Sequence, residues 1–198
     1  SLSTLRAVWS FADVANALAN VASGMHPLLP TAAELLAWGG NLLPATQAQP
    51  WRLVSSAFLH AGAIHLGFNM WALWNMGAIA ERFYGNRPFL ALYLLSGLLG
   101  SLASLHFAAS EAVSVGASGA IFGVSGALLA ALFTKPDKLP APLVASMRSS
   151  LLMFVGYSLF LGFTSNVVDN AAHVGGLVAG FALATIMAEK FDWTEYRR

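Results

Sequence analysis

The sequence predicts an all-α membrane protein, folded as a compact bundle of six transmembrane helices. Hydrophobic residues make up 57% of the 198-residue chain and charged residues only 10%, a composition well outside that of soluble domains. Five long apolar segments and one more polar segment approach the roughly 20 residues that a helix needs to cross a bilayer. No repeat or long linker divides the chain, so residues 1–198 are expected to form a single membrane domain.

The candidate transmembrane segments follow one another along the chain. They lie near residues 4–23, 62–81, 88–109, 116–134, 148–164 and 171–189. The first is interrupted by Asp13, Asn16 and Asn20, which share one helical face. We expect this segment to span the membrane with its polar face packed into the bundle, and a helix lying in the membrane interface is the alternative.

The connection between the first two spans, residues 24–61, is too long for a tight turn. Several prolines punctuate it, and its apolar stretches are too short to cross a membrane. We expect a structured loop with small helices at the membrane surface.

Basic residues predict the orientation in the membrane, because they favour the cytoplasmic side. With a cytoplasmic N-terminus, only Arg52 of the ten Lys and Arg residues falls outside. The others are Arg6, Arg82, Arg87, Lys135, Lys138, Arg148, Lys190, Arg197 and Arg198. The polar residues that open the second, fourth and sixth spans then lie at one depth, near the outer surface.

Two of these polar residues suggest catalysis. Ser118 follows the sequence Val-Gly-Ala and His173 follows Asn-Ala-Ala, each at the start of an apolar segment. A serine hydroxyl is a weak nucleophile unless a base accepts its proton, and histidine titrates near neutral pH. The sequence therefore predicts a nucleophile, Ser118, and its general base, His173, on two helices that pack together.

Glycines around these residues predict close helix packing. Gly119 with Gly123, and Gly176 with Gly180, form small-xxx-small patterns, which let two helix backbones approach. We assign these glycines, together with Gly116, to helix packing at the site.

His65 and Asn69 lie on one face of the second span, four residues apart. Attack of a serine on a peptide carbonyl creates an oxyanion, which needs hydrogen-bond donors already in place. The expected donors are the His65 ring, the Asn69 amide and the Ser118 backbone N–H. The alternative for the two side chains is an interhelical hydrogen bond that holds the bundle.

Other chemistries lack the residues that they require. Asp169 lies one helical turn before His173, but two side chains stacked along a helix seldom form a triad, so a solvated carboxylate or helix N-cap is expected. The zinc motif H-E-x-x-H is absent, and only Asp13 lies well within a span, which leaves no aspartyl pair. There is no cysteine, and a net charge of +1 argues against nucleic acid. We expect a Ser–His dyad without metal or cofactor.

These motifs resemble those of the rhomboid family of intramembrane serine proteases, and they occur in the same order. They are Trp51-Arg52, His65-xxx-Asn69, Glu81-Arg82, Gly116-Ala117-Ser118-Gly119 and Ala172-His173-xx-Gly176-xxx-Gly180. The resemblance implies structural roles for Trp51, Arg52 and Glu81. It also implies one for Phe122, which stands where some members carry Tyr and can still pack on His173.

The resemblance further implies a six-helix bacterial-type core in a cytoplasmic membrane, with both termini cytoplasmic. Ser118 is then the nucleophile and His173 the base, and the site opens to the outer face. Expected substrates are single transmembrane segments of membrane proteins, cut near that face after a small residue such as Ala.

A rhomboid-like binding protein and a small channel or transporter are the two alternatives to a protease. A rhomboid-like binding protein recognises transmembrane segments without cutting them, but such proteins lose the serine or the histidine. A small channel or transporter needs polar residues at both membrane faces, whereas here they gather near one.

Overall fold

The structure is a computed structural model that describes residues 29–108, 112–134, 140–164 and 168–187. Within these ranges the chain is helical, with no strand and one isolated bridge between Asn41 and Ser114. The predicted first span, 4–23, lies outside the described residues together with its polar side chains. The all-α fold class is confirmed for the part of the chain that the structure describes.

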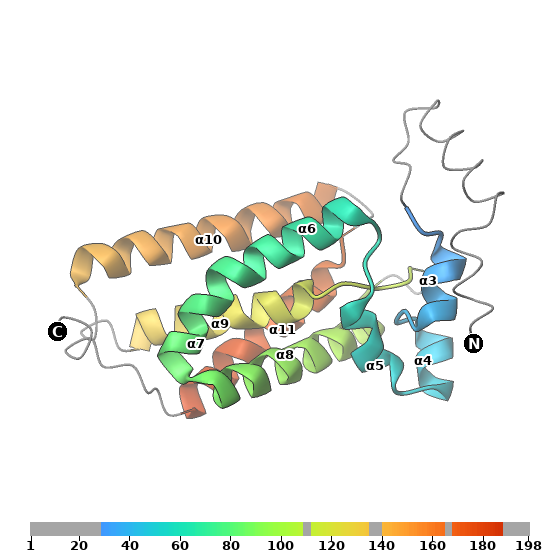
Figure 1. Ribbon diagram of the computed structural model, residues 1–198, viewed down its shortest axis with the longest axis horizontal. Coiled ribbons are helices and arrows are strands. Elements are labelled where there is room, and N and C mark those ends of the chain that lie inside the picture. Colours follow the sequence, from blue (N-terminus) through green and yellow to red (C-terminus); the bar gives the residue numbers. More distant parts are fainter. Residues whose placement is uncertain (1–28, 109–111, 135–139, 165–167, 188–198) are drawn as a thin grey trace.

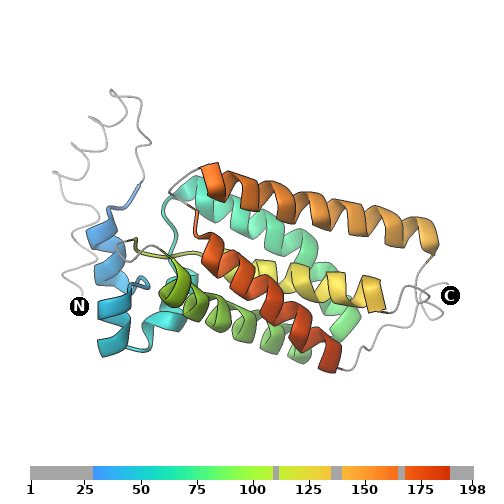
Figure 2. The same cartoon turned by 180° about the vertical axis from the view of Figure 1, so that it is seen from behind.

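The long helices run side by side in one bundle (Figures 1 and 2). In chain order they are α6 (Ala63–Ala72), a π-helical turn η2 (Leu73–Gly77), α7 (Ala78–Tyr84), α8 (Asn86–Phe107), α9 (Ser118–Thr134), α10 (Ala141–Thr164) and α11 (Asn170–Ile186). The five later predicted spans each correspond to one of these segments, if α6, η2 and α7 are taken as one.

Two of the predicted spans differ in where the regular helix lies. The regular helix of the fourth span begins at Ser118, two residues after the predicted start near 116, because Gly116 has a φ of 122°. The second span is not one regular helix, since η2 interrupts it and α7 carries it on to Tyr84. The nucleophile candidate therefore stands at the very start of its helix.

The fifth helix is longer than the predicted 148–164. α10 begins at Ala141, because Pro142 is tolerated in the first turn, where its missing N–H costs no helical hydrogen bond. Arg148, the first residue of the predicted span, lies within the helix and donates a hydrogen bond to the Leu132 carbonyl of α9. α8 and α11 begin and end within one helical turn of their predicted bounds.

Small helices fill the connection before α6, as the sequence predicts. They are α3 (Ala32–Trp38), α4 (Leu43–Ala48), α5 (Arg52–Ser55) and the 3-10 turn η1 (Ser56–Phe58). They gather at the end of the bundle where α9 and α11 begin (Figure 1). Thr31 and Glu34 form a capping box at the start of α3. Arg52 donates hydrogen bonds to the carbonyls of Leu36, at 2.5 Å, and Gly40, at 3.2 Å, which ties α3 to α5.

α9 is the central helix of the bundle, and its residues from Gly119 to Leu132 are all buried. The hydroxyl of Tyr84, a fully buried residue of α7, donates a hydrogen bond to the Ala127 carbonyl at 2.9 Å. A polar group in an apolar core requires such a partner. Ser118 is therefore carried by the most completely buried helix of the described bundle.

α9 and α11 approach each other through glycines. A Cβ atom at Gly176 would overlap the carbonyl oxygen of Gly119, and one at Gly180 would overlap that of Gly123. Residues with side chains do not fit at such contacts. The two small-xxx-small patterns thus face each other and set the distance between the helices that carry the two candidate catalytic residues.

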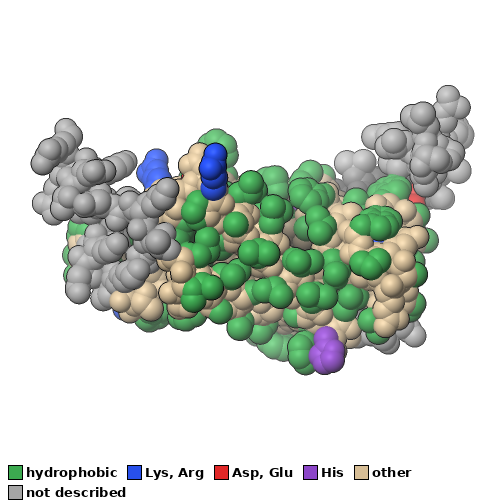
Figure 3. All heavy atoms as spheres, turned by 90° about the horizontal axis from the view of Figure 1, so that it is seen from below, with side chains coloured by type: hydrophobic (Ala, Val, Ile, Leu, Met, Phe, Trp, Pro, Cys, Tyr) green, Lys and Arg blue, Asp and Glu red, His purple; other side chains and the backbone are tan. Residues whose placement is uncertain are grey.

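Large hydrophobic side chains cover the outside of the bundle. Trp74 is 81% exposed and Phe163 80%, and Figure 3 shows hydrophobic side chains over much of one face. Contiguous apolar surface of this extent is rare on proteins that face water. α8 and α10 are long and apolar enough to cross a membrane, whereas α9 and α11 are apolar but shorter. The outer surface therefore suits a lipid environment.

Gly180→Ala should destabilise the bundle, because the new Cβ meets backbone of α9. Overpacking costs about 1–3 kcal/mol, and each kcal/mol lowers the melting temperature of a chain of this size by about 2–4 °C. Gly156→Ala in α10 is the matched control, since a Cβ there meets no atom within 4 Å and alanine favours the helix. Thermal unfolding in detergent should separate the two variants, and equal melting temperatures would contradict the close approach.

Candidate active site

Ser118 and His173 meet at the end of the bundle that the small helices cover. Ser118 is the first residue of α9, and His173 lies near the start of α11. Ser118 Oγ and His173 Nε2 are hydrogen bonded at 2.8 Å. Both helices begin at this end (Figure 1), so their packing brings the two side chains to one level. In this geometry an imidazole can accept the proton of a hydroxyl.

An aromatic stack fixes the imidazole of His173. The ring of Phe122, one turn after Ser118, lies 4.1 Å from it between centroids and at an angle of only 11°. Phe122 is 2% exposed and also packs against Phe154 of α10, with ring centroids 5.7 Å apart. Because a buried ring supports one face of the imidazole, its Nε2 atom stays directed at Ser118. The stack uses the aromatic face and needs no hydroxyl.

The segment before Ser118 is held by the small helices. Ser114 and Asn41 exchange two backbone hydrogen bonds, of 2.8 and 3.0 Å, and Gly116 donates its N–H to the Ser56 carbonyl at 2.9 Å. At Gly116 a Cβ would lie only 2.7 Å from Cε1 of His65. Gly116 thus lies before the start of α9 and packs this turn against α6.

His65 and Asn69 bring hydrogen-bond donors to the same place. Nδ1 of His65 accepts a hydrogen bond from the N–H of Ala61 at 3.3 Å, so the neutral ring carries its proton on Nε2. Asn69, which is 5% exposed, donates one amide hydrogen to the His65 carbonyl at 2.9 Å and has a second to offer. His65 Nε2 and Asn69 Nδ2 both lie beside Gly116, two residues before Ser118.

Asp169 does not complete a triad in this structure. Its carboxylate oxygens accept hydrogen bonds from the Ala172 N–H at 2.9 Å and from the Ser104 hydroxyl at 2.5 Å. Nδ1 of His173, which a triad carboxylate would hold, has no hydrogen-bond partner among the described residues. Asp169 is the N-cap of α11. Sequence analysis missed Ser104, because a small residue in an apolar helix gives no signal of a polar partner.

His60 supports His65 from the connection before α6. The two rings meet edge to face, with centroids 5.2 Å apart and an interplanar angle of 67°. Burial lowers the pKa of His60, and a hydrogen bond with the Phe58 backbone opposes this shift. Burial therefore disfavours a positive charge on His60 beside His65.

The other predicted residues lie away from the Ser118–His173 pair. Trp51 is 52% exposed, and the guanidinium of Arg52 lies 4.9 Å from its ring centroid. Glu81 is exposed on α7, at the opposite end of the bundle in Figure 1. The ranges that the structure describes contain no group of three His, Asp or Glu residues that could hold a metal ion.

Comparison with known proteins gives the family. Residues 47–190 match the Rhomboid domain. The chain is 39% identical over 141 residues to Rhomboid protease GluP of Bacillus subtilis (strain 168), a match that covers 71% of this chain and 27% of the relative. It is 40% identical over 164 residues to RHOMBOID-like protein 5 of Arabidopsis thaliana, and this match covers 82% of this chain and 52% of the relative. It is 31% identical over 190 residues to Rhomboid-like protease 2 of Toxoplasma gondii, and this match covers 92% of this chain and 65% of the relative.

The matches cover the part of the chain that builds the site. All motifs that carry the resemblance, from Trp51 to Gly180, fall inside residues 47–190. The chain spans only 27% to 65% of the length of these three relatives. The resemblance seen in the sequence is confirmed, and the chain belongs to the rhomboid family of integral membrane proteins.

Proposed function

We propose that the protein is an intramembrane serine endopeptidase. It hydrolyses a peptide bond within or next to a transmembrane segment of a membrane-protein substrate, by means of a Ser–His dyad. The observation that carries this proposal is the 2.8 Å hydrogen bond between Ser118 Oγ and His173 Nε2 at one end of an apolar bundle. Two of the relatives bear the names rhomboid protease and rhomboid-like protease, which supports the same class of activity.

The reaction passes four proton transfers through one imidazole, two in each of its two steps. His173 Nε2 accepts the hydroxyl proton as Ser118 Oγ attacks the carbonyl carbon, and it then donates that proton to the leaving amine. The ester that remains on Ser118 is cleaved by water, whose proton His173 accepts before it returns a proton to Oγ. The stack with Phe122 keeps the ring in place through both steps.

Three donors are proposed to stabilise the tetrahedral oxyanion. They are the Nε2–H of His65, the free amide hydrogen of Asn69 and the backbone N–H of Ser118. The last has no helical acceptor, because Ser118 is the first residue of α9. Donors fixed before the substrate arrives need no reorganisation when negative charge develops.

Residues 1–198 are proposed to form one rhomboid-type domain with six spans, of which 4–23 is the first. α9 has 17 residues and at about 1.5 Å per residue measures about 26 Å, shorter than the roughly 30 Å hydrocarbon core. With its C-terminal end at the cytoplasmic surface, Ser118 lies below the outer surface and reacts within the thickness of the membrane.

The cytoplasmic side is proposed to be the basic end of the bundle. Exposed Arg82 and Arg87 flank the α7–α8 connection, opposite the site. Arg52, at the site end, is buried and bonded within the small helices. This arrangement follows the rule that positive charge stays cytoplasmic. The site then opens to the outer face of a bacterial cytoplasmic membrane, and both termini are cytoplasmic.

The proposed substrates are single-span membrane proteins in the surrounding bilayer. In a helix the carbonyl groups are engaged in backbone hydrogen bonds, so the segment must unwind before Ser118 reaches its target carbon. Helix-weakening residues near the cut, and a small residue such as Ala before it, should favour cleavage. The dyad and the donors all come from the chain, so the reaction requires no cofactor or metal.

Ser118→Ala should abolish cleavage of a tagged single-span reporter protein while the melting temperature is kept, because alanine preserves the packing and removes only the oxygen. His173→Ala should be equally inactive, and the double variant no worse, since the pair acts as a unit. Labelling of Ser118 by a fluorophosphonate gives a second measurement.

Ser125→Ala is the matched control for the nucleophile. Ser125 is a buried serine of α9 whose hydroxyl bonds to the Ile121 carbonyl at 3.0 Å, away from His173. This variant should keep both labelling and cleavage. Cleavage by Ser118→Ala above background, or a folded parent protein that binds substrate but never takes the label, would contradict the proposed activity.

Asp169→Asn should keep kcat within about tenfold of the parent, because an asparagine still caps α11 and a dyad needs no carboxylate. The precedent for an Asp→Asn change in a true triad is a loss of about 10⁴ in kcat. Steady-state kinetics on folded protein decides, and a loss near that size would replace the dyad by a triad.

Asn69→Ala and His65→Ala should each lower kcat by about 10²–10³, as expected for an oxyanion donor, with little change in KM. Asn75→Ala is the control. Asn75 also donates to the carbonyl four residues earlier, that of Trp71 at 2.7 Å, but it is exposed. If the first two variants lose melting temperature and keep kcat per folded molecule, both residues hold the bundle and do not act in the reaction.

A further inference from the structure

α8 brings no group to the proposed reaction, yet two sets of hydrogen bonds connect it to the two halves of the dyad. We call them the first arm, which starts at Ser104, and the second arm, which starts at Ser101. We propose that Asp169 and Asn41 are positioning residues that fix the start of α11 and the segment before Ser118 against this one helix. The proposal rests on the proposed function of the Ser118–His173 pair and adds what maintains their contact.

The first arm holds the base. Ser104 of α8, which is 5% exposed, donates its hydroxyl to the Asp169 carboxylate at 2.5 Å. The second oxygen of this carboxylate caps the Ala172 N–H, and the Asp169 carbonyl accepts the backbone N–H of His173 at 3.1 Å. One residue therefore joins α8 to the backbone of the catalytic base.

The second arm holds the nucleophile. Asn41, only 1% exposed, donates its amide to the Ser101 carbonyl of α8 at 2.9 Å and accepts the Thr46 hydroxyl at 2.8 Å. Its backbone N–H and carbonyl pair with Ser114, four residues before Ser118. A buried amide is costly unless it is paired. Here its pairing joins α8, α4 and the nucleophile segment.

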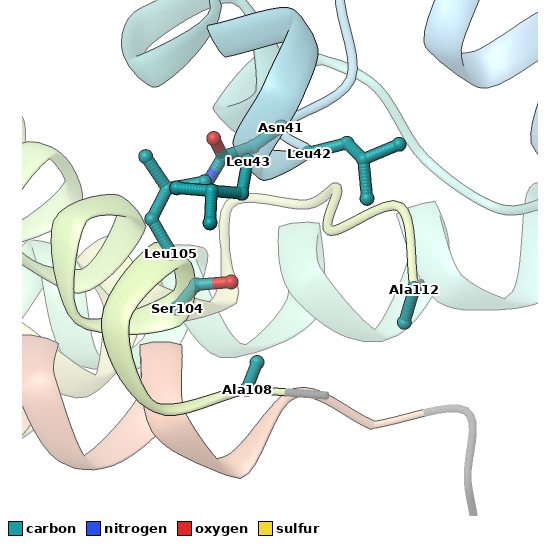
Figure 4. A pocket seen from close by; sticks show the side chains of 7 residues that line it. All are labelled: Asn41, Leu42, Leu43, Ser104, Leu105, Ala108 and Ala112. Atoms are coloured by element: carbon teal, nitrogen blue, oxygen red, sulfur yellow. The ribbon is translucent and has the colours of Figure 1, made fainter. Parts of the chain in front are cut away.

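The two arms start next to each other. Ser101 and Ser104 are three residues apart and so lie on one side of α8. Figure 4 shows Asn41 and Ser104 around a small hollow between α8 and the residues that precede α4. Its other lining residues are leucines and alanines: Leu42, Leu43, Leu105, Ala108 and Ala112. Asn41 is 1% exposed and Ser104 5%, so these two polar side chains are shielded from competing water.

The arms fix the positions of Ser118 and His173 along the helix axes, which the glycine contact between α9 and α11 does not fix. That contact sets how far apart the helices lie, but glycines have no side chains to interlock along the helix axes. The level of Ser118 relative to His173 needs a separate constraint, since a shift of about 1 Å can cost about 10² in rate. The two arms provide this constraint at the site end of the bundle, because both attach to α8.

Kinetics of single variants tests the first arm. Ser104→Ala and Asp169→Ala should each lower kcat about tenfold or more, with KM within about twofold, and should slow fluorophosphonate labelling of Ser118. Asp169→Asn should recover most of the loss, because its amide can accept from Ala172 and donate to Ser104. Ser101→Ala is the matched control and should be unchanged, because Ser101 contributes only its carbonyl to the second arm.

Hydrogen exchange tests the two arms separately and needs no activity. Asn41→Ala should speed exchange in a peptide covering 112–118 and leave one covering 168–176 unchanged. Ser104→Ala should do the reverse. Because each arm holds one segment, the effects should not spread over the whole bundle.

Uniform faster exchange, or variants that lose melting temperature but keep kcat per folded molecule, would overturn the proposal. So would an Asp169→Asn variant as slow as Asp169→Ala, since charge rather than hydrogen bonding would then matter. A parent that neither cuts nor takes the label contradicts the proposed function instead, and the exchange experiment still decides on the arms.

Discussion

The contact between α9 and α11 is the constraint on which the rest of the described structure depends. Gly176 and Gly180 lie against the backbone carbonyls of Gly119 and Gly123, where a Cβ would overlap. This close approach brings the short side chain of Ser118 within hydrogen-bond reach of His173 on the other helix. In lipid, helices gain little from burying apolar groups against one another, so close backbone packing is a main source of association. The same glycines thus serve stability and the geometry of the site.

Two sets of polar groups in the described bundle bear on the site. Those of Tyr84, Asn41 and Asp169 are paired within the chain, with carbonyls, hydroxyls or backbone N–H groups as partners. The Nε2–H of His65 and the second amide hydrogen of Asn69 lie beside the turn before Ser118, and these are the donors proposed for the oxyanion. Pairing the first set makes the scaffold rigid, and in the proposed reaction this rigidity holds the second set ready for charge that appears only in the transition state. The small helices contribute to this rigidity through the bridge between Asn41 and Ser114.

Hydropathy predicted the five later spans well, because a membrane helix must be apolar over most of its length. It predicted their ends less well, since these follow from local backbone features: the positive φ of Gly116 and the tolerated Pro142. The π turn η2 escaped prediction because its residues are as apolar as their neighbours. Ser118 and His173 could be identified as a candidate pair from residue type and position. Ser104 and Asn41 could not, because their partners lie 65 and 60 residues away in the chain and neither type is unusual in its segment.

The position of the cut in a substrate tests the central claim most directly. The parent protein and Ser118→Ala are reconstituted in lipid vesicles with a tagged single-span protein, and the products are mapped by mass spectrometry. We expect one main cut within or beside the apolar segment, near the end that faces outward, and no such product with Ser118→Ala. A cut confined to water-exposed loops far from the apolar segment, or the same product from both proteins, would contradict an intramembrane protease that acts through Ser118.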